Sequence, residues 1–180
     1  MSAQATAPDA RALLTGGVLA GEWALDPRNS SIRLKTKAMG LVPVNGVFRE
    51  VSGTCTVSAN GQVSGVVTIT AASVDTKNAR RDTHLRSADF FDSDNNPDIT
   101  FAAHGVRPSG QGATVTGALT VRGATLPLSF EAAASVQGDD EVRFDAVVLI
   151  NRADFGLTWN VMGLASMKNT LTIRATFVRR

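Results

Sequence analysis

Few residue types in this 180-residue chain could carry out catalysis, because it holds only two histidines and one cysteine. Asp82 and His84 place a carboxylate near an imidazole, but positions i and i+2 of a helix point to different faces, which argues against a catalytic dyad. Together with Cys55, the histidines His84 and His104 could supply three metal ligands at most, and their spacing resembles no zinc motif. The sequence thus predicts no catalytic site, no bound metal and no cofactor.

The segment INRADFGL holds another polar pair, Arg152 and Asp154, at the end of a predicted strand. The fork of an arginine can bind a phosphate or a carboxylate through two hydrogen bonds, so Arg152 is a candidate for contact with a ligand headgroup. In the alternative, Arg152 pairs with an acidic side chain such as Asp82 or Asp89 and holds the segment around that residue in place. We favour this second interpretation, and the two roles can coexist.

Most of the chain has the period-two pattern of β-strands. In NTLTIRATFVR, residues 171, 173, 175 and 177 are apolar and alternate with polar residues, and the segments 31–37 and 124–136 follow the same rule. The segment EVRFDAVVLI is apolar on both faces, which predicts that both faces are buried, against a partner subunit, a covering element or an internal cavity. Short turn signals between successive strands favour an antiparallel meander of about eight strands, closed into a barrel or packed as a sandwich.

The interior of such a barrel should be dry. Eight phenylalanines and two tryptophans occur with no tyrosine, so nearly all ring surface lacks a hydroxyl group. Small residues such as Ala71, Ala132, Ala146 and Ala175 alternate with large ones on the predicted inner faces. Because eight strands enclose just enough space either for side chains or for one small ligand, this pattern leaves both a packed core and an apolar tube open.

One segment, DTKNARRDTHLRSADFFD, departs from the period of a strand and predicts a short helix. Asp75 or Thr76 is its candidate N-cap, and Leu85, Phe90 and Phe91 are its apolar anchors. The segment DNNP ends it, because a residue before proline avoids the α conformation. We expect this helix to cover the mouth or the side of the barrel.

Composition and charge narrow the class of protein further. Hydrophobic residues make up 43% and charged residues 19%, which is typical of a folded domain, and the net charge of +2 with few aromatic residues gives little reason to expect a nucleic-acid partner. The single Cys55 excludes an intramolecular disulfide framework. Residues 1–20 lack the pattern of an export signal, so we expect a flexible leader, one domain over residues 21–180, a cytoplasmic location and no transmembrane segment.

The order of several motifs resembles that of the YceI family of bacterial polyisoprenoid-binding proteins. These motifs are GEWALDPRNSSI, VNGVF, RDTHLRSADFF with PDITF, VTGALTVRGATLPLSF and INRADFGL, and they extend from about Gly21 to Phe177. The resemblance implies an extended, lipocalin-like antiparallel barrel of eight strands, with a short helical segment covering a hydrophobic pore. It also implies a non-enzymatic protein that binds or carries a long isoprenoid lipid and is often found as a dimer.

Carried onto this chain, the resemblance assigns two groups of residues. The expected pore wall comprises Trp23, Phe48, Ile69, Phe101, Leu119, Val121, Leu128, Phe130, Phe144, Val148, Ile150, Trp159, Leu171 and Ile173, with the two tryptophans near the ends. The expected cover and headgroup contacts are Arg81, Asp82, His84, Leu85, Phe90, Phe91, Arg152, Asp154 and Phe155. In this arrangement the charged side of the helix meets water, while its apolar anchors close over the lipid.

The chain departs from the usual family pattern at Asn29 and Ala38, where relatives commonly have histidine, and at Asn169, where an acidic residue is common. These departures predict a different headgroup or a ligand without one. Two other readings stay open: a solidly packed barrel with a structural or stress-related role through subunit contacts, and an enzyme that uses Asp82, His84 and Arg152 on a lipid headgroup. A bulky Ala146→Phe change separates a tube from a packed barrel, because only the packed barrel would be destabilised.

Overall fold

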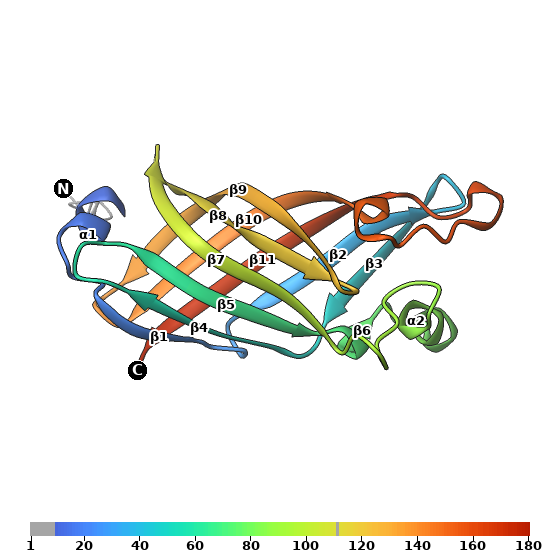
Figure 1. Ribbon diagram of the computed structural model, residues 1–180, viewed down its shortest axis with the longest axis horizontal. Coiled ribbons are helices and arrows are strands. Elements are labelled where there is room, and N and C mark those ends of the chain that lie inside the picture. Colours follow the sequence, from blue (N-terminus) through green and yellow to red (C-terminus); the bar gives the residue numbers. More distant parts are fainter. Residues whose placement is uncertain (1–9, 111) are drawn as a thin grey trace, which may run out of the picture.

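The computed structural model describes residues 10–110 and 112–180 of the chain. It consists mainly of antiparallel strands, with short helices at the two ends of an elongated body (Figure 1). The strands are β1 Gly21–Leu25, β2 Ser31–Ala38, β3 Val42–Phe48, β4 Val51–Val57, β5 Val63–Thr70, β6 Val74–Asp75, β7 Asp98–Ser109, β8 Gly112–Val121, β9 Ala124–Gln137, β10 Glu141–Asn151 and β11 Lys168–Arg179. The helices are α1 Ala10–Thr15 and α2 Ala79–Arg86, and single 3-10 turns occupy Ala71–Ser73, Arg152–Phe155 and Val161–Gly163.

Within the described residues, eight strands close into a ring in the order β1, β4, β5, β7, β8, β9, β10, β11 and back to β1. The closing pair joins Trp23 of β1 to Arg179 of β11. A closed ring removes the exposed strand edges at which sheets aggregate. The predicted antiparallel barrel of eight strands is thus confirmed.

Three further strands extend this barrel at one end. β11 pairs with β1 only through its last residues, and its first half pairs instead with β2, from Thr170↔Lys35 to Arg174↔Ser31. β3 and the short β6 continue from β2, so the barrel wall carries an additional hairpin that the sequence prediction did not separate from the ring. The β2–β3 turn projects at the end of the body that also carries α2 (Figure 1).

The side chains of β10 and β11 alternate between the inner and the outer face of the barrel, as the period-two pattern of the sequence predicts. Phe144, Ala146 and Val148 of β10 lie on the inner face, and Ala146 pairs with Ile173 of β11. On the outer face of β10, Val147 and Leu149 are 66% and 76% exposed. No other element of the described residues covers this outer face, so its expected burial against a partner subunit stays a prediction.

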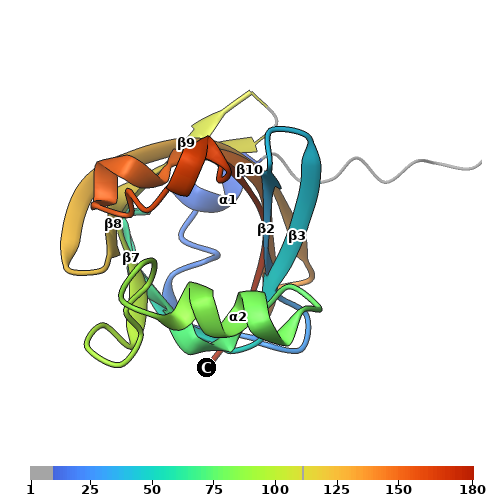
Figure 2. The ribbon, with the colours of Figure 1, turned by 90° about the vertical axis from the view of Figure 1, so that its right-hand side faces the viewer.

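The two ends of the barrel differ. α2 and the segment 152–167 lie on opposite sides of one end, with the β2–β3 hairpin beside them, and α1 is visible at the far end (Figure 2). Residues 10–20, expected as part of a flexible leader, contain α1 and the buried Leu19, while residues 1–9 of that leader lie outside the described residues. None of the helices in the described ranges is long and apolar enough to cross a bilayer.

Candidate functional site

An apolar inner cavity of about 170 Å³ occupies the half of the barrel nearer α1. Leu19 and Trp23 line the end of this cavity nearest α1. There the indole nitrogen of Trp23 donates a hydrogen bond to the Leu19 carbonyl at 2.9 Å. The guanidinium of Arg179 lies 4.5 Å from the centre of the Trp23 ring. Trp23 is thus held in place with its one polar atom paired, and it presents an apolar surface to the cavity.

A second, outer cavity of about 320 Å³ lies beneath α2 and the segment 152–167. Ile32, Ile69, Leu119 and Leu171 line both cavities, so the two cavities adjoin at these four side chains. We use "tube" for the two cavities together. For scale, an engineered apolar cavity of about 150 Å³ in a protein core stays dry and takes up benzene. The barrel is therefore hollow rather than filled by its own side chains.

The walls stay open partly because small residues accept the large rings. Phe101 of β7 lines the inner cavity, and its ring lies over Gly117 of β8, where a Cβ atom would come within 2.5 Å of the ring. Phe101 also packs against Phe130, with ring centroids 5.6 Å apart. The rings thus lie on the wall and on one another, which leaves the lumen free.

The structure brings together all of the residues expected in the pore wall. The inner cavity is lined by Trp23, Phe101, Leu128, Phe130, Phe144, Val148 and Ile173, the outer cavity by Phe48, Val121, Ile150 and Trp159, and both by Ile69, Leu119 and Leu171. The two tryptophans line different cavities. Whether each of these side chains touches a ligand stays a prediction.

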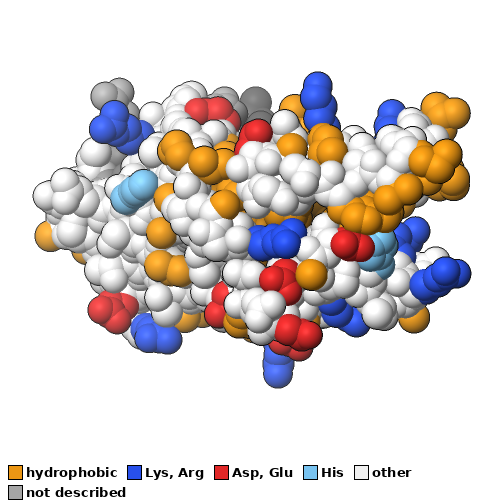
Figure 3. Space-filling model, turned by 45° about the vertical axis from the view of Figure 1, so that its right-hand side comes forward, with side chains coloured by type: hydrophobic (Ala, Val, Ile, Leu, Met, Phe, Trp, Pro, Cys, Tyr) orange, Lys and Arg blue, Asp and Glu red, His pale blue; other side chains and the backbone are white. Residues whose placement is uncertain are grey.

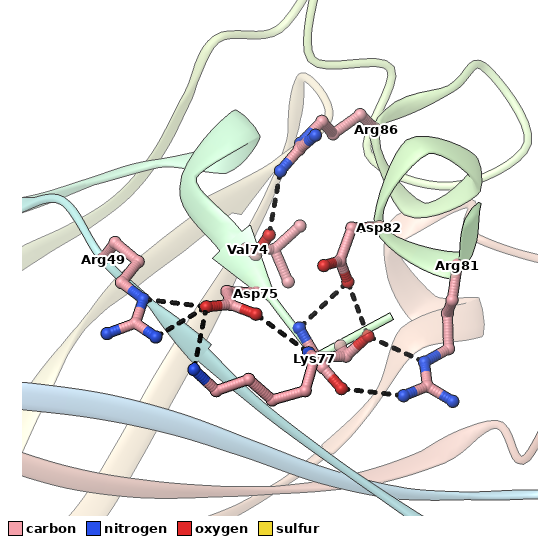
Figure 4. Close-up of polar contacts among 8 residues, drawn as sticks. Arg49, Val74, Asp75, Lys77, Arg81, Asp82 and Arg86 are labelled. Carbon is pink, nitrogen blue, oxygen red and sulfur yellow. Dashed lines mark hydrogen bonds and ion pairs between the residues drawn. The ribbon is translucent and has the colours of Figure 1, made fainter. Parts of the chain in front are cut away.

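Two charged residues of α2, Arg81 and Asp82, fix the helix to Thr76, the residue that follows β6 (Figure 4). The buried carboxylate of Asp82 accepts hydrogen bonds from the backbone N–H of Thr76 at 2.9 Å and from its hydroxyl at 2.5 Å. Arg81 donates to the Thr76 hydroxyl at 2.7 Å and to the Thr76 carbonyl at 2.9 Å. Asp82 does not line the tube, so its part in this fold is anchoring, and the expectation of a ligand contact is not supported for it.

The start of α2 differs from the prediction. Asn78, and neither Asp75 nor Thr76, caps the helix by accepting a hydrogen bond from the Arg81 N–H. Asp75 belongs to β6 and instead binds Arg49 and Lys77 (Figure 4). The hydrogen bond from Arg49 lowers the pKa of Asp75 to about 2, so this carboxylate keeps its charge, and the contact, in mildly acidic solution.

An aromatic cluster joins α2 to the segment 152–167 across the end of the tube. The ring of His84 meets Trp159 edge to face at 4.5 Å and Phe90 at 5.1 Å, and Phe90 lies 5.3 Å from Trp159. The Nε2 atom of His84 lies 2.8 Å from Asp89 Oδ2. His84 therefore pairs with Asp89 and not with Asp82. Its ring lines the outer cavity.

Arg152 is buried, and all of its guanidinium nitrogens bind backbone carbonyls. It donates to Ser166 at 2.9 Å, to Leu157 at 2.5 Å and to Ala165 at 3.1 Å. Burial lowers the pKa of this guanidinium from its ordinary value. The predicted pairing with Asp82 or Asp89 is wrong, because carbonyl oxygens of the folded loop accept hydrogen bonds from all three guanidinium nitrogens.

Of the other residues expected in the cover, some line the outer cavity and one lies on the protein surface. Leu85, Phe91 and Phe155 line the outer cavity, and Phe91 packs edge to face on Phe48 at 5.8 Å. Asp154 is exposed and does not line the tube. The expectation that the apolar anchors of the helical segment face inward is met for Leu85, Phe90 and Phe91.

Several lining residues escaped the sequence prediction. Leu19 lies in the expected leader, Leu157 lies in a loop, and Ile32 and Leu34 belong to a strand that was recognised but left out of the wall. The inward alternation of Ile32 with Leu34 could have identified those two. Nothing local marks Leu19 or Leu157, because their burial depends on how a terminal segment and a loop fold back.

The three departures from the family pattern do not lie together. Ala38 and Asn169 line the outer cavity, whereas Asn29 lies in the β1–β2 turn and donates to Asp26 at 2.7 Å. Only Ala38 and Asn169 can therefore influence a group held at the α2 end.

In the described ranges, no group of three histidine, cysteine or acidic side chains is placed to hold a metal ion.

Cys55 of β4 lines the inner cavity and provides a test of how dry it is. Burial raises the pKa of its thiol to about 11 from an ordinary value of 9.0. Below both values the reactive thiolate is then about a hundredfold rarer than in an exposed thiol. We expect iodoacetamide at pH 8 to alkylate the folded protein about a hundredfold more slowly than the urea-unfolded chain, as followed by mass spectrometry. Equal rates would contradict a dry inner cavity.

Comparisons with known proteins agree with this architecture. The family model described as the YceI-like domain matches residues 23–178. A protein of Salmonella arizonae named Protein YceI is 33% identical over 175 residues, which cover 92% of this chain and 91% of the relative.

Solved structures give the same picture. The barrel of Burkholderia cenocepacia BcnA matches with a TM-score of 0.77 at 23% identity, covering 84% of this chain and 98% of that one. A polyisoprenoid-binding domain from Saccharophagus degradans, implicated in plant cell wall breakdown, matches with a TM-score of 0.73 at 16% identity, covering 88% and 98%. A Campylobacter jejuni YceI protein matches with a TM-score of 0.65 at 27% identity, covering 76% and 85%.

Proposed function

Because this chain belongs to the YceI-like family, we propose that it binds one long apolar lipid of the isoprenoid type, polyprenyl or quinone-like, and carries it without chemical change. The observation that carries the proposal is that two apolar cavities adjoin within one barrel and share Ile32, Ile69, Leu119 and Leu171 in their walls. A long chain that passes these four side chains would lie in both cavities, whereas a compact ligand would fill only one of them. The polyisoprenoid-binding barrel of Saccharophagus degradans, which shares the fold, supports this class of ligand.

The distribution of polar groups gives the ligand a direction. The one charged residue that lines the inner cavity among the described residues is Arg174, which is paired with Asp145, whereas Lys37, Arg81 and His84 line the outer cavity. A polar headgroup would lose its hydration in the inner cavity without finding partners there, which costs several kcal/mol. The tail therefore occupies the inner cavity, and any headgroup stays at the α2 end.

The energetics favour a long tail. Each CH₂-sized group moved from water into the tube contributes about 0.8 kcal/mol, so a few isoprene units outweigh the entropy lost when the chain is ordered. Affinity should then rise with chain length until the inner cavity is full. A preference for chain length, rather than for one headgroup, is the signature of this mode of binding.

Neither rival reading is supported by the described residues. A packed barrel would have no cavities of this size. The enzyme hypothesis needs Asp82, His84 and Arg152 to converge, yet each is engaged by a different partner. The dimer stays a prediction, and the exposed Val147 and Leu149 of β10 are its candidate contact.

Mass spectrometry of the protein purified under native conditions tests the proposal. We expect an organic extract to contain a prenyl lipid in about equimolar amount, and native mass measurement to give both the occupancy and the oligomeric state. Empty protein should take up an added polyprenol. A protein that is empty and also rejects added polyprenols of several lengths would overturn the proposal.

A further inference from the structure

The end of the barrel beside α2 carries an exposed apolar surface that the fold itself does not need. Figure 3 shows hydrophobic side chains gathered at this end of the molecule. They belong to the β2–β3 turn and to the segment 161–164, and Leu41 and Met162 are 85% and 88% exposed. We define the apolar tip as Met39, Leu41, Val42, Val161, Met162 and Leu164, all of them exposed.

The two loops of the apolar tip form one surface. The backbone N–H of Met39 donates to the Leu164 carbonyl at 2.5 Å, and Ala38 forms a β-bridge with Ala165. Both turns use a Met-Gly pair with positive φ, at 49° and 71° for Met39 and Gly40 and at 56° and 68° for Met162 and Gly163. A methionine adopts this conformation less readily than an asparagine, so turn geometry alone does not explain why two methionines project here.

The charged residues nearest in sequence to the apolar tip are lysines. Lys35 and Lys37 of β2 and Lys168 of β11 are exposed on the strands that lead to it, and no acidic residue occurs in segments 27–49 and 155–180. None of these lysines forms an ion pair with another described residue. Asp89 and Asp94 lie in the segment after α2, and the exposed Asp154 lies at the start of the loop that carries residues 161–164.

We propose that the apolar tip docks the protein on a bilayer surface that contains anionic lipids. Exposed apolar side chains enter the interface between headgroups and acyl chains, and flanking lysines are attracted to anionic headgroups. Met39 and Leu164 belong both to the apolar tip and to the lining of the outer cavity. Docking in this orientation brings the α2 end of the tube against the apolar phase, so a lipid tail that passes between α2 and the segment 152–167 could enter the bilayer without crossing water.

Co-sedimentation with vesicles tests the docking surface. We expect the wild-type protein to bind vesicles of phosphatidylcholine with phosphatidylglycerol, to bind less as salt is raised, and to bind pure phosphatidylcholine weakly. The double variant L41D/M162D should lose at least about tenfold in affinity, because two inserting side chains become charged. Aspartate tolerates the left-handed conformation at position 162, so this variant should fold as the wild type does.

Two further variants make the test specific. V147D/L149D changes an equally exposed apolar pair on the outer face of β10 and should bind vesicles as the wild type does. K35Q/K37Q/K168Q should bind more weakly and lose most of the salt dependence.

Outcomes that overturn the docking proposal are an absence of wild-type binding to anionic vesicles, or equal loss in the tip and β10 variants. A tip variant that only turns a dimer into a monomer would also overturn it and would make the apolar tip a contact between copies of the chain.

This docking surface is tested separately from the lipid tube. Leu41 and Met162 do not line either cavity, so L41D/M162D should still take up a short, water-soluble prenyl probe. Loss of vesicle binding with retained probe uptake supports docking by the apolar tip. Failure of the wild type to take up the probe would count against the tube, whatever the vesicles show.

Discussion

Replacing Ala146 by phenylalanine is expected to weaken binding of a long prenyl chain by about 50-fold while leaving the fold intact. Ala146 lies between Phe144 and Val148 on the inner face of β10, and its methyl group lines the inner cavity. A ring at this position takes the space of about three CH₂-sized groups, each contributing about 0.8 kcal/mol to binding. Because the ring enters a cavity of about 170 Å³, the free energy of unfolding should change by less than about 1 kcal/mol.

The neighbouring residue supplies a matched control for this change. Val147 is 66% exposed on the outer face of the same strand, so Val147→Phe adds a ring outside the tube and should leave binding unchanged. Titration with a fluorescent long-chain prenyl probe measures the affinities, and urea unfolding measures the stabilities. A loss of 1 to 3 kcal/mol in Ala146→Phe, with no change in binding, would indicate a packed barrel instead.

The barrel itself could be predicted from sequence because its evidence is local and repeated. The alternation of Leu171 and Ile173 with polar neighbours fixes which face of β11 points inward, and the structure agrees. The same rule could not say what would cover Val147 and Leu149, since that depends on surfaces outside the strand. Periodicity reports the face of a residue but not its final environment.

The polar residues of the candidate site were harder to place. Aspartate, threonine and asparagine are all good helix caps, so DTKN offered several starts, and Asn78 became the cap because Asp75 is held by Arg49 in β6. The carbonyls that surround Arg152 come from residues 157, 165 and 166, which a loop brings together. The spacing of residues in a sequence does not show which backbone carbonyl will accept a hydrogen bond from an arginine.

Replacing Arg152 by methionine is expected to destabilise the protein by about 3 kcal/mol and to loosen the segment 152–167. The change leaves the carbonyls of Leu157, Ala165 and Ser166 without their charged donor, and a hydrogen bond to a charged group contributes about 1.5 to 3 kcal/mol. It also removes the cation that lies 5.3 Å from the centre of the Phe90 ring, which is one contact of this loop with the helical side of the tube. Urea unfolding measures the loss of stability, and amide hydrogen exchange over residues 157–166 measures the loosening.

A surface arginine shows whether the effect of Arg152→Met is specific to burial. Arg174 is exposed and donates to Asp145 at 2.9 Å, so Arg174→Met should cost less than about 1 kcal/mol. Arg152→Lys should recover only part of the loss, because one ammonium group cannot reach three diverging carbonyls. If the free energy of unfolding of Arg152→Met lies within about 0.5 kcal/mol of the wild-type value, the three hydrogen bonds do not hold the loop in place. With the loop loosened, a bound prenyl lipid should also leave faster, because the segment 152–167 and α2 together close this end of the tube.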